Sequence, residues 1–244
     1  IAALRAERER RVLRVHLGAD VDAGLHELKG RGLTGSTINR YKSTLCAVFI
    51  YYCQHPDYKR VVHHLKFTNP VRQETVSRFK ENPAKDRFLS QEEQKALLEV
   101  CRASHWEKLY LLVLMALTTG ARKGELLNLK WSDIEFRSRT ATLGKTKNGK
   151  PRLLPLTQPV IKELMKFREN SNFLVFQSTV SKTTPFDIKK AWLKALSASE
   201  IGHCRFHDLR HTAASNLVRA GRTLFEVGTL LGHSSTTMTA RYAH

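Results

Sequence analysis

The sequence predicts a mainly α-helical fold with a small antiparallel β-sheet, divided into two domains. Apolar residues recur at helical spacing through most of the chain, and two short alternating runs flank an Asn148-Gly149 dipeptide, which favours a hairpin turn. The polar segment at residues 80–87 contains Pro83, which cannot continue a helix. We therefore expect a helical domain at residues 1–82 and a mixed α/β domain at residues 83–244. The chain starts at Ile1, so the first domain is expected to be N-terminally incomplete.

The first domain is predicted to contain a long helix that is capped by Gly35-Ser36-Thr37. Its exposed side is expected to carry Asn39, Arg40 and Lys42 close to the helix N-terminus, where backbone amides can also meet phosphate. A solvated face with no ligand is the alternative interpretation. The apolar residues at helical spacing are Ile38, Tyr41, Leu45, Val48, Phe49 and Tyr52.

The second domain is predicted to begin with a capping box, Ser90 to Glu93, that opens a helix ending near Arg102. A buried helix follows at about Glu107 to Thr118 and ends at Thr119-Gly120. The remaining expected elements are strands at Thr140–Leu143 and Arg152–Leu156, a further strand at Phe173–Phe176, and helices at about Gln158–Asn170, Pro185–Ser199, Phe206–Arg219, Leu224–Leu231 and Thr236–Tyr242.

The charge of the chain predicts a polyanionic partner. There are 41 Lys and Arg against 22 Asp and Glu, which gives a formal net charge of +19. The longest apolar run, Leu109 to Leu117, is too short to cross a bilayer of about 30 Å, so no membrane association is expected. Its four cysteines show no metal-binding or disulfide spacing, which fits a reducing cytoplasm. Nucleic acid is therefore the expected partner.

Two arginines are candidates for holding a reacting phosphate. In-line attack on a phosphodiester builds negative charge on its non-bridging oxygens, and a guanidinium donates a bidentate pair of hydrogen bonds to such a group. Arg122 and Arg210 lie in short segments of unusual composition, AR-KG-E and HDLRH. His207 lies three positions before Arg210, so the two side chains share a helix face and can point at one phosphate.

A tyrosine, histidines and a lysine complete this chemistry without a metal. The hydroxyl of Tyr242 can act as the nucleophile, but it needs a base or a hydrogen-bond acceptor, and His207 or His233 could serve. The departing 5′ oxygen needs a proton, which Lys147 on the hairpin tip could supply. Each segment alone is more often structural; together they can carry out phosphoryl transfer.

These motifs resemble a known family. AR-KG-E, HDLRHTAAS, LLGH and RY, in this order, closely resemble the catalytic domain of the tyrosine recombinases, the lambda-integrase family. The resemblance runs from about Arg87 to the end and is most specific at His207–His244. More loosely, the segment at residues 36–40 and Asn69-Pro70 resemble the helical core-binding domain of that family.

The resemblance implies a role for each candidate. Arg122 and Arg210 would clamp the scissile phosphate, and Tyr242 would attack it to leave a 3′-phosphotyrosine. His207 and His233 would assist proton transfer and hold the phosphate, while Glu125 would support the site without reacting. Lys147 would be the general acid; Lys145 and Lys150 share its hairpin, and Lys147 is preferred because it directly precedes the Asn-Gly turn and best matches the family when residues 152–156 are aligned.

The resemblance also implies partners. Residues 1–82 would be a core DNA-binding domain and residues 83–244 the catalytic domain, closing together around double-stranded DNA. The free protein is expected as a monomer or weak oligomer, and as a homo-tetramer on two DNA sites, with accessory DNA-bending proteins as further partners. No cofactor is expected, and the location would be the cytoplasm, in association with the nucleoid. The predicted DNA contacts are Ser36, Thr37, Asn39, Arg40 and Lys42.

Three other functions are compatible with parts of the sequence. A zinc-dependent nuclease could use His203, His207 and His211 with Cys204, although no HExxH motif is present and Gly202 indicates that the helix starts after His203. A type IB topoisomerase would use the same chemistry, but the small size and the HDLRH form favour recombination. A DNA-binding regulator would explain the charge but not the ordered motifs.

Overall fold

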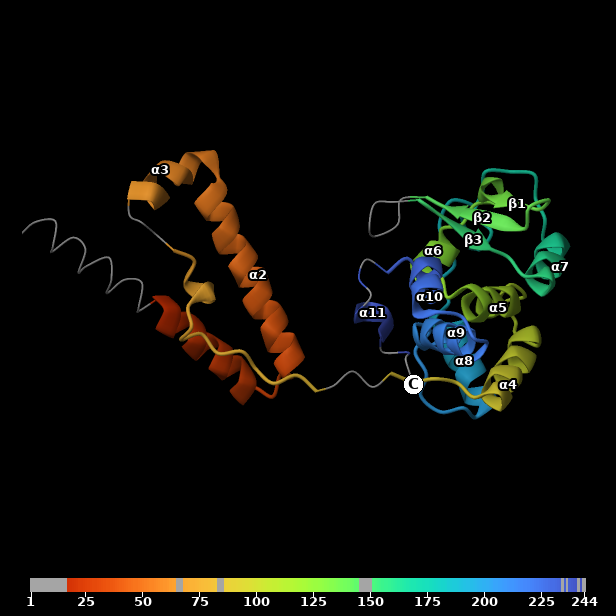
Figure 1. The fold of residues 1–244 in the computed structure, drawn as a ribbon, viewed down its shortest axis with the longest axis horizontal. Helices are drawn as coiled ribbons and strands as arrows, with labels where there is room; N and C mark the ends of the chain where they lie inside the picture. The colour runs from red at the N-terminus through yellow and green to blue at the C-terminus, as the bar shows by residue number, and fades with distance from the viewer. Residues whose placement is uncertain are drawn as a thin grey trace, which may run out of the picture. The chain divides into compact units, whose positions relative to one another are not determined.

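The computed structural model describes residues 17–64, 68–82, 86–144, 151–233, 235, 237–240 and 242. The chain separates into two compact units, Ile1–Ala84 and Lys85–His244, so the division falls inside the polar segment at residues 80–87 (Figure 1). None of the helices in the described ranges is long and apolar enough to cross a membrane.

The regular elements described in the first unit are all helices. Residues 17–30 form a helix, followed by α2 (Gly35–Gln54), α3 (Pro56–His64) and the short 3₁₀ helix η1 (Pro70–Arg72). The segment at residues 76–81 returns to the first helix and to α2: Ser77 N–H donates to Oδ1 of Asp22 (2.6 Å), and the backbone of Phe79 pairs with the side chain of Asn39 on α2. A small core of Leu25, Ile38 and Val76 holds this unit together.

The start of α2 differs from the prediction by one residue. Thr34 is the N-cap, with extended backbone angles, and its hydroxyl accepts a hydrogen bond from Thr37 N–H (3.3 Å). Gly35 and Ser36 already belong to the helix, so the predicted cap at Gly35-Ser36-Thr37 was wrong in its position.

The apolar stripe predicted for α2 is only partly a core face. Ile38 is fully buried, but the side chains of Tyr41 and Val48 are 54% and 45% exposed. The helical spacing identified the helix correctly. In the described part of this unit, however, the buried core packs against α2 at Ile38. Periodicity alone could not show which part of the apolar stripe would pack against another segment of the unit.

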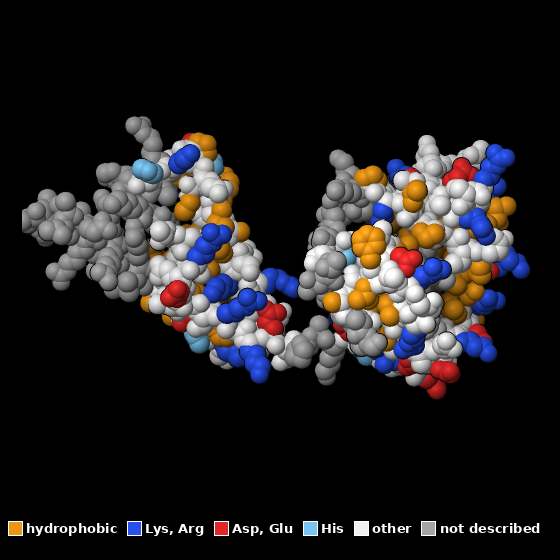
Figure 2. All heavy atoms as spheres, in the orientation of Figure 1, with side chains coloured by type: hydrophobic (Ala, Val, Ile, Leu, Met, Phe, Trp, Pro, Cys, Tyr) orange, Lys and Arg blue, Asp and Glu red, His pale blue; other side chains and the backbone are white. Residues whose placement is uncertain are grey.

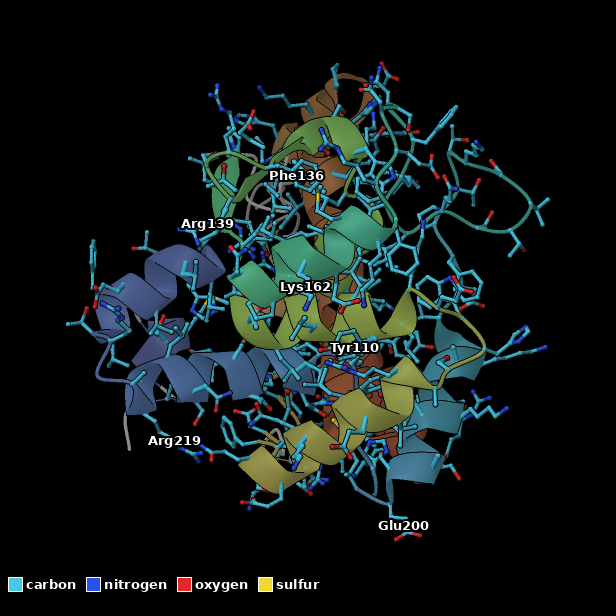
Figure 3. All side chains as sticks on the ribbon, turned by 90° about the vertical axis from the view of Figure 1, so that its right-hand side faces the viewer. Tyr110, Phe136, Arg139, Lys162, Glu200 and Arg219 are labelled. Carbon is cyan, nitrogen blue, oxygen red and sulfur yellow. The ribbon has the colours of Figure 1, made fainter. Side chains whose placement is uncertain are left out.

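The second unit is built around one fully apolar helix. The helix α4 (Gln91–Arg102) begins with the predicted capping box, in which Glu93 N–H donates to the Ser90 hydroxyl and Ser90 N–H donates to Glu93. The helix α5 (Leu109–Thr119) follows and is buried on all sides, as its run of apolar residues predicted. Figure 3 shows α4, α5 and α7 (Gln158–Lys166) side by side, with Tyr110 on α5 and Lys162 on α7.

A three-stranded antiparallel sheet lies at one end of this unit, in the order β1 (Ile134–Glu135), β2 (Thr140–Leu143), β3 (Arg152–Pro155) (Figure 1). The register pairs Thr140 with Pro155 and Leu143 with Arg152, so the predicted hairpin strands are confirmed. The Asn148-Gly149 turn lies outside the described residues. β1 was not predicted, because it is only two residues long and follows the 3₁₀ helix η2 (Trp131–Asp133).

The predicted strand at Phe173–Phe176 was wrong. Only Leu174 forms a bridge, with Lys130, and the neighbouring Val175 N–H donates to Leu129 (2.8 Å). The helix predicted from Pro185 starts later for a related reason: Pro185 bridges to Gln177 before the chain turns helical. Tertiary backbone pairing thus replaces the locally predicted structure at both places.

The remaining helices follow the predicted order, and the mainly α fold with a small antiparallel sheet is confirmed. The helix α7 ends at Lys166 rather than near Asn170, and the last helix is shorter than predicted. Besides α4, α5 and α7, the α-helices described in this unit are α6 (Lys123–Leu127), α8 (Lys189–Ser199), α9 (Asp208–Arg219), α10 (Leu224–Leu231) and α11 (Thr237–Ala240).

Candidate active site

Arg122, Glu125 and Arg152 form a charged cluster at the start of α6. Arg122 occupies the N-cap position, where its backbone N–H and its Nη1 each donate to the Glu125 carboxylate at 2.8 Å. Nη2 of Arg152 on β3 donates to the same carboxylate at 2.7 Å. Burial raises the pKa of Glu125, but the hydrogen bonds from Arg122 and the charges of both arginines outweigh it, so the pKa lies below its ordinary value. Glu125 therefore holds two arginines as a carboxylate.

Arg210 on α9 is buried and anchored by backbone carbonyls. Its Nη1 donates to Gly120 O and its Nη2 to Leu231 O, both at 2.7 Å. Gly120, two residues before Arg122, caps α5 with a backbone in the left-handed region (φ 63°). This conformation directs the carbonyl of Gly120 at the guanidinium of Arg210. The ends of α5 and α10 thus fix the plane of the Arg210 guanidinium.

The arginines generate a positive field that is only partly balanced within the site. Burial, followed by the charges of Arg122 and Arg152, lowers the pKa of Arg210 to about 10, against weaker opposing effects of Glu125 and Tyr242. Burial likewise lowers the pKa of Arg152. Because three guanidiniums share one carboxylate, an anion bound here would favour their charged forms.

His207 lies at the start of α9 next to Arg210. Its pKa lies below the ordinary value, first because of burial and then because of the charge of Arg210. The next residue, Asp208, is buried and accepts a bidentate ion pair from Arg205 (2.6 Å at the shorter contact), which holds the first turn of α9. His207 is therefore disposed to be neutral at neutral pH.

The ring of Tyr242 is buried, and its hydroxyl lies 2.7 Å from Nδ1 of His211. The ring of His233 stacks against it at a centroid distance of 6.5 Å, and Phe88 packs edge-on at 6.3 Å. Nδ1 of His233 in turn lies 2.7 Å from the hydroxyl of Thr239. On the other side of His211, Oδ1 of Asp86 lies 3.7 Å from Nε2.

The structure brings most of the predicted catalytic residues into one connected site. Arg122, Glu125, His207, Arg210, His233 and Tyr242 are linked through the contacts above. Lys147, with the alternatives Lys145 and Lys150, lies outside the described residues.

Three further side chains were not predicted as part of this site: Asp86, Arg152 and His211. His211 is four residues after His207, a helical spacing that places both on one face of α9, and their rings meet edge-on at 5.1 Å. That spacing was a usable signal for His211. Asp86 and Arg152 carried no such signal, because their partners are far away in the sequence.

The predicted DNA contacts of the first unit fall into two groups. Ser36, Thr37 and Arg40 are exposed. Asn39 and Lys42, which were expected on the exposed side, are instead half-buried: Nδ2 of Asn39 donates to Phe79 O (2.8 Å) and Nζ of Lys42 to Val76 O (2.8 Å). These two side chains attach the segment at residues 76–81 to α2, a requirement that helical periodicity did not reveal.

The histidine run considered for zinc does not form a helical series. The helix α9 begins at Asp208, so His203 precedes it and cannot share a face with His207 and His211. Burial, followed by the charge of Asp208, raises the pKa of Cys204 to about 11, which disfavours the thiolate that a metal requires. Within the described ranges, no three His, Cys, Asp or Glu side chains are grouped as a metal site.

Comparison with known proteins places this site in a family. Residues 87–244 match the phage integrase family. A shufflon-specific DNA recombinase of Escherichia coli is 32% identical over 223 residues, which cover 91% of this chain and 54% of that protein. The chain spans about half the length of the curated relatives that it matches, with 43% of the integrase of Salmonella phage P22 and 56% of the tyrosine recombinase XerA of Pyrococcus furiosus.

Solved structures share the fold. The catalytic domain of the bacteriophage HP1 integrase is 28% identical, with a TM-score of 0.53 over 64% of this chain and 86% of that one. The integrase of transposon Tn1549, solved with transposon right end DNA, has a TM-score of 0.72 at 19% identity, over 93% of this chain and 80% of that one. The family match over residues 87–244, with the arginines, histidines and tyrosine of its motifs gathered in one site, shows that the chain belongs to the phage integrase family of tyrosine recombinases.

Proposed function

We propose that this chain is a site-specific DNA recombinase that cleaves and rejoins DNA strands through a covalent 3′-phosphotyrosine at Tyr242. The observation that carries the proposal is the connection between the tyrosine and the arginines: the hydroxyl of Tyr242 is bound to His211, and the adjacent residue, Arg210, is anchored beside Arg122. Relatives and structural neighbours named as recombinases and integrases, among them one solved with DNA, support the same activity.

The arginines supply the binding site for the scissile phosphate. Each terminal nitrogen of Arg210 uses one N–H on a carbonyl, so part of its set of five donors remains for an anion in a fixed plane. Arg122 is held by Glu125 in the same way. Charge developing on the non-bridging oxygens would meet donors that are already oriented, which lowers the barrier without reorganisation of the protein.

The reaction then proceeds in one displacement. The oxygen of Tyr242 bonds to phosphorus as the bond from phosphorus to the 5′ oxygen breaks, and Lys147 donates a proton to that departing oxygen. His207 and His233 assist proton transfer and hold the phosphate. A phosphotyrosine diester replaces a phosphodiester of similar energy, so the broken strand can be rejoined by the reverse reaction. No metal or nucleotide takes part.

The first unit is proposed to hold duplex DNA as the core-binding domain, with the catalytic domain formed by residues 83–244. A groove of about 760 Å³ beside α2 is lined by the predicted contacts Ser36, Asn39, Arg40 and Lys42, together with Arg72 and Arg78. Figure 2 shows Lys and Arg side chains across this unit. A groove rich in cations follows a phosphate backbone without reading its sequence. The proposed active assembly is a homo-tetramer that joins two DNA sites.

Tyr242→Phe tests the proposed nucleophile. The variant loses one oxygen and keeps the packing against Phe88 and His233, so we expect wild-type DNA binding and no covalent complex with a nicked suicide duplex. Denaturing gel electrophoresis measures the adduct, and a mobility shift measures binding. Tyr110→Phe, which alters a tyrosine on α5 that contacts Arg102, is the matched control and should form the adduct normally. An adduct in Tyr242→Phe would place the nucleophile at another residue.

A further inference from the structure

His211 has contacts on both ring nitrogens that match those of a general base. Nδ1 lies 2.7 Å from the Tyr242 hydroxyl, and Nε2 lies 3.7 Å from a carboxylate oxygen of Asp86. The imidazole is buried, with 6% of its surface exposed, so bulk water does not compete for either nitrogen. Asp86 is 22% exposed and lies at the start of the second unit.

These contacts define which nitrogen carries the proton of a neutral His211. A carboxylate accepts but does not donate, so Asp86 favours the tautomer with hydrogen on Nε2. In that tautomer Nδ1 carries the lone pair that accepts the hydrogen bond from the Tyr242 hydroxyl. A carboxylate, an imidazole and a hydroxyl in this order form the arrangement that activates hydroxyl nucleophiles in unrelated hydrolases.

We propose, on the basis of the function proposed above, that His211 is the general base of strand cleavage and that Asp86 positions it. The hydroxyl proton of Tyr242 passes to Nδ1 of His211 as the tyrosine oxygen bonds to phosphorus. The bond to the 5′ oxygen breaks in the same displacement, and that oxygen takes its proton from the general acid. Rejoining reverses each step, with the imidazolium returning its proton to the tyrosine oxygen.

The other two histidines of the site are engaged differently. His233 stacks on the tyrosine ring, and its Nδ1 faces the hydroxyl of Thr239 at 2.7 Å. His207 lies beside Arg210, whose charge lowers the pKa of His207 further after burial, which suits a residue that contacts the phosphate. His211 lies within hydrogen-bonding distance of the reacting oxygen, the position required of the group that takes the proton from it.

The charged and titratable groups around His211 determine how its protonation affects the rate. From the segment before α4 it faces Asp86, from α9 it faces His207 and Asp208, and after α11 it faces Tyr242. The carboxylates of Asp86 and Asp208 both lie near His211, so the His211 imidazolium formed during cleavage has negative charges close by. The phosphate would add negative charge to this environment.

The test is single-turnover cleavage of a nicked suicide duplex by the full chain over a range of pH. His211→Ala removes the base, and His211→Asn leaves an acceptor near the position of Nδ1 that cannot take a proton. Both should form the covalent adduct about 10²-fold or more slowly than wild type, the range that a general base contributes. Both should also lose the rise of rate with pH that deprotonation of the base produces. Added imidazole should accelerate His211→Ala, and more basic imidazoles should accelerate it more.

Asp86→Asn tests the positioning residue. Without the carboxylate, the protonated imidazole loses a counter-charge, so the rising part of the rate–pH profile should move to lower pH. His203→Ala is the matched control: it removes a histidine that precedes α9, and both rate and profile should match wild type.

Each result decides the proposal. His211→Ala that cleaves at the wild-type rate or faster would show that the hydrogen bond restrains Tyr242 in a resting position. Slow His211 variants that keep the wild-type pH profile and show no imidazole rescue would make His211 a structural residue. If the wild-type protein forms the adduct, either result refutes the proposal that His211 is the general base. If the wild-type protein forms no adduct, the proposed recombinase function is refuted instead.

Discussion

At the scale of single residues, the site depends on arginines placed where their charge is hard to stabilise. Burial is the largest cause of the decrease that brings the pKa of Arg210 to about 10, and two neighbouring guanidiniums add to it. A buried cation that is incompletely paired destabilises the free protein and binds an anion strongly. The geometry of Arg210 is fixed by two carbonyls, so its proposed contribution to catalysis would depend on the planar fork as well as on its charge.

We predict that Arg122→Lys and Arg210→Lys each slow strand cleavage by about 10²–10³-fold, the usual loss for one oxyanion donor. Lysine keeps the charge but cannot donate in two fixed directions. Cleavage of a suicide duplex measures the rate, and DNA binding should change much less, because many other cations contact the backbone. Arg219→Lys, at the exposed end of α9, is the control and should be unaffected. A wild-type rate in either active-site variant would make that arginine a positioning residue.

Lys147 requires a separate test, because its hairpin lies outside the described residues. A 5′ oxygen leaves poorly unless it is protonated, whereas a 5′ sulfur leaves readily. Lys147→Ala should therefore cleave ordinary DNA slowly and a 5′-bridging phosphorothiolate duplex at nearly the wild-type rate. Selective rescue of Lys145→Ala or Lys150→Ala in its place would assign the proton donor to that lysine. Equal impairment of Lys147→Ala on both duplexes would mean that it stabilises phosphate charge.

At the scale of elements, two helix ends create the arginine site. The C-terminus of α5 presents Gly120 O to Arg210, and the C-terminus of α10 presents Leu231 O to the same side chain. Gly120 can take its positive φ without strain, and a Cβ there would lie 2.4 Å from Cδ2 of Leu231. The close approach of α5 and α10 therefore depends on a residue without a side chain.

Gly120→Ala should lower the free energy of unfolding by about 2–4 kcal/mol, from the left-handed backbone and the overlap with Leu231. Gly124→Ala is the control within α6, where nothing lies within 4 Å of an added Cβ, and it should be neutral or slightly stabilising. Urea denaturation followed by circular dichroism measures both. Equal stability of the two variants would show that α5 and α10 can separate at no cost.

At the scale of the whole molecule, a net charge of +19 over two units fits a protein that holds a polyanion with both. Cations bound to phosphates release counterions, so affinity should fall steeply with salt while the covalent step, made inside the site, should not. In the proposed reaction, the exchange of one diester for another would also make an external energy source unnecessary.

We therefore expect the chain to join suicide or recombination substrates in EDTA and without ATP, at the same rate as with added magnesium. Gel analysis of recombinant products measures the reaction, and a restriction endonuclease inhibited by the same EDTA is the control. A strict requirement for a metal or a nucleotide would contradict the mechanism. Relaxation of supercoils without recombinant products would indicate a topoisomerase instead.

The sequence by itself determined the features that depend on neighbouring residues. The Ser90–Glu93 capping box, the buried helix ending at Gly120, the two hairpin strands and the order of the motifs could all be predicted, because capping, periodicity and turn formation act over a few residues. The position of His207 and Arg210 on one helix face could also be predicted, because it depends only on their spacing of three residues.

Only the tertiary structure decided which side chains meet. His211 reaches Tyr242 across 31 positions of sequence, Glu125 joins Arg122 to Arg152 on a strand 27 positions later, and Asn39 attaches to a segment 40 positions away. No local pattern encodes such contacts, because they arise when α5, α9, α10 and the sheet pack around a common core and bring distant residues within hydrogen-bonding distance. The helical spacing from His207 marks His211 in the sequence, but its contact with Tyr242, which identifies it as the proposed base, could be recognised only after the helices had been placed in space.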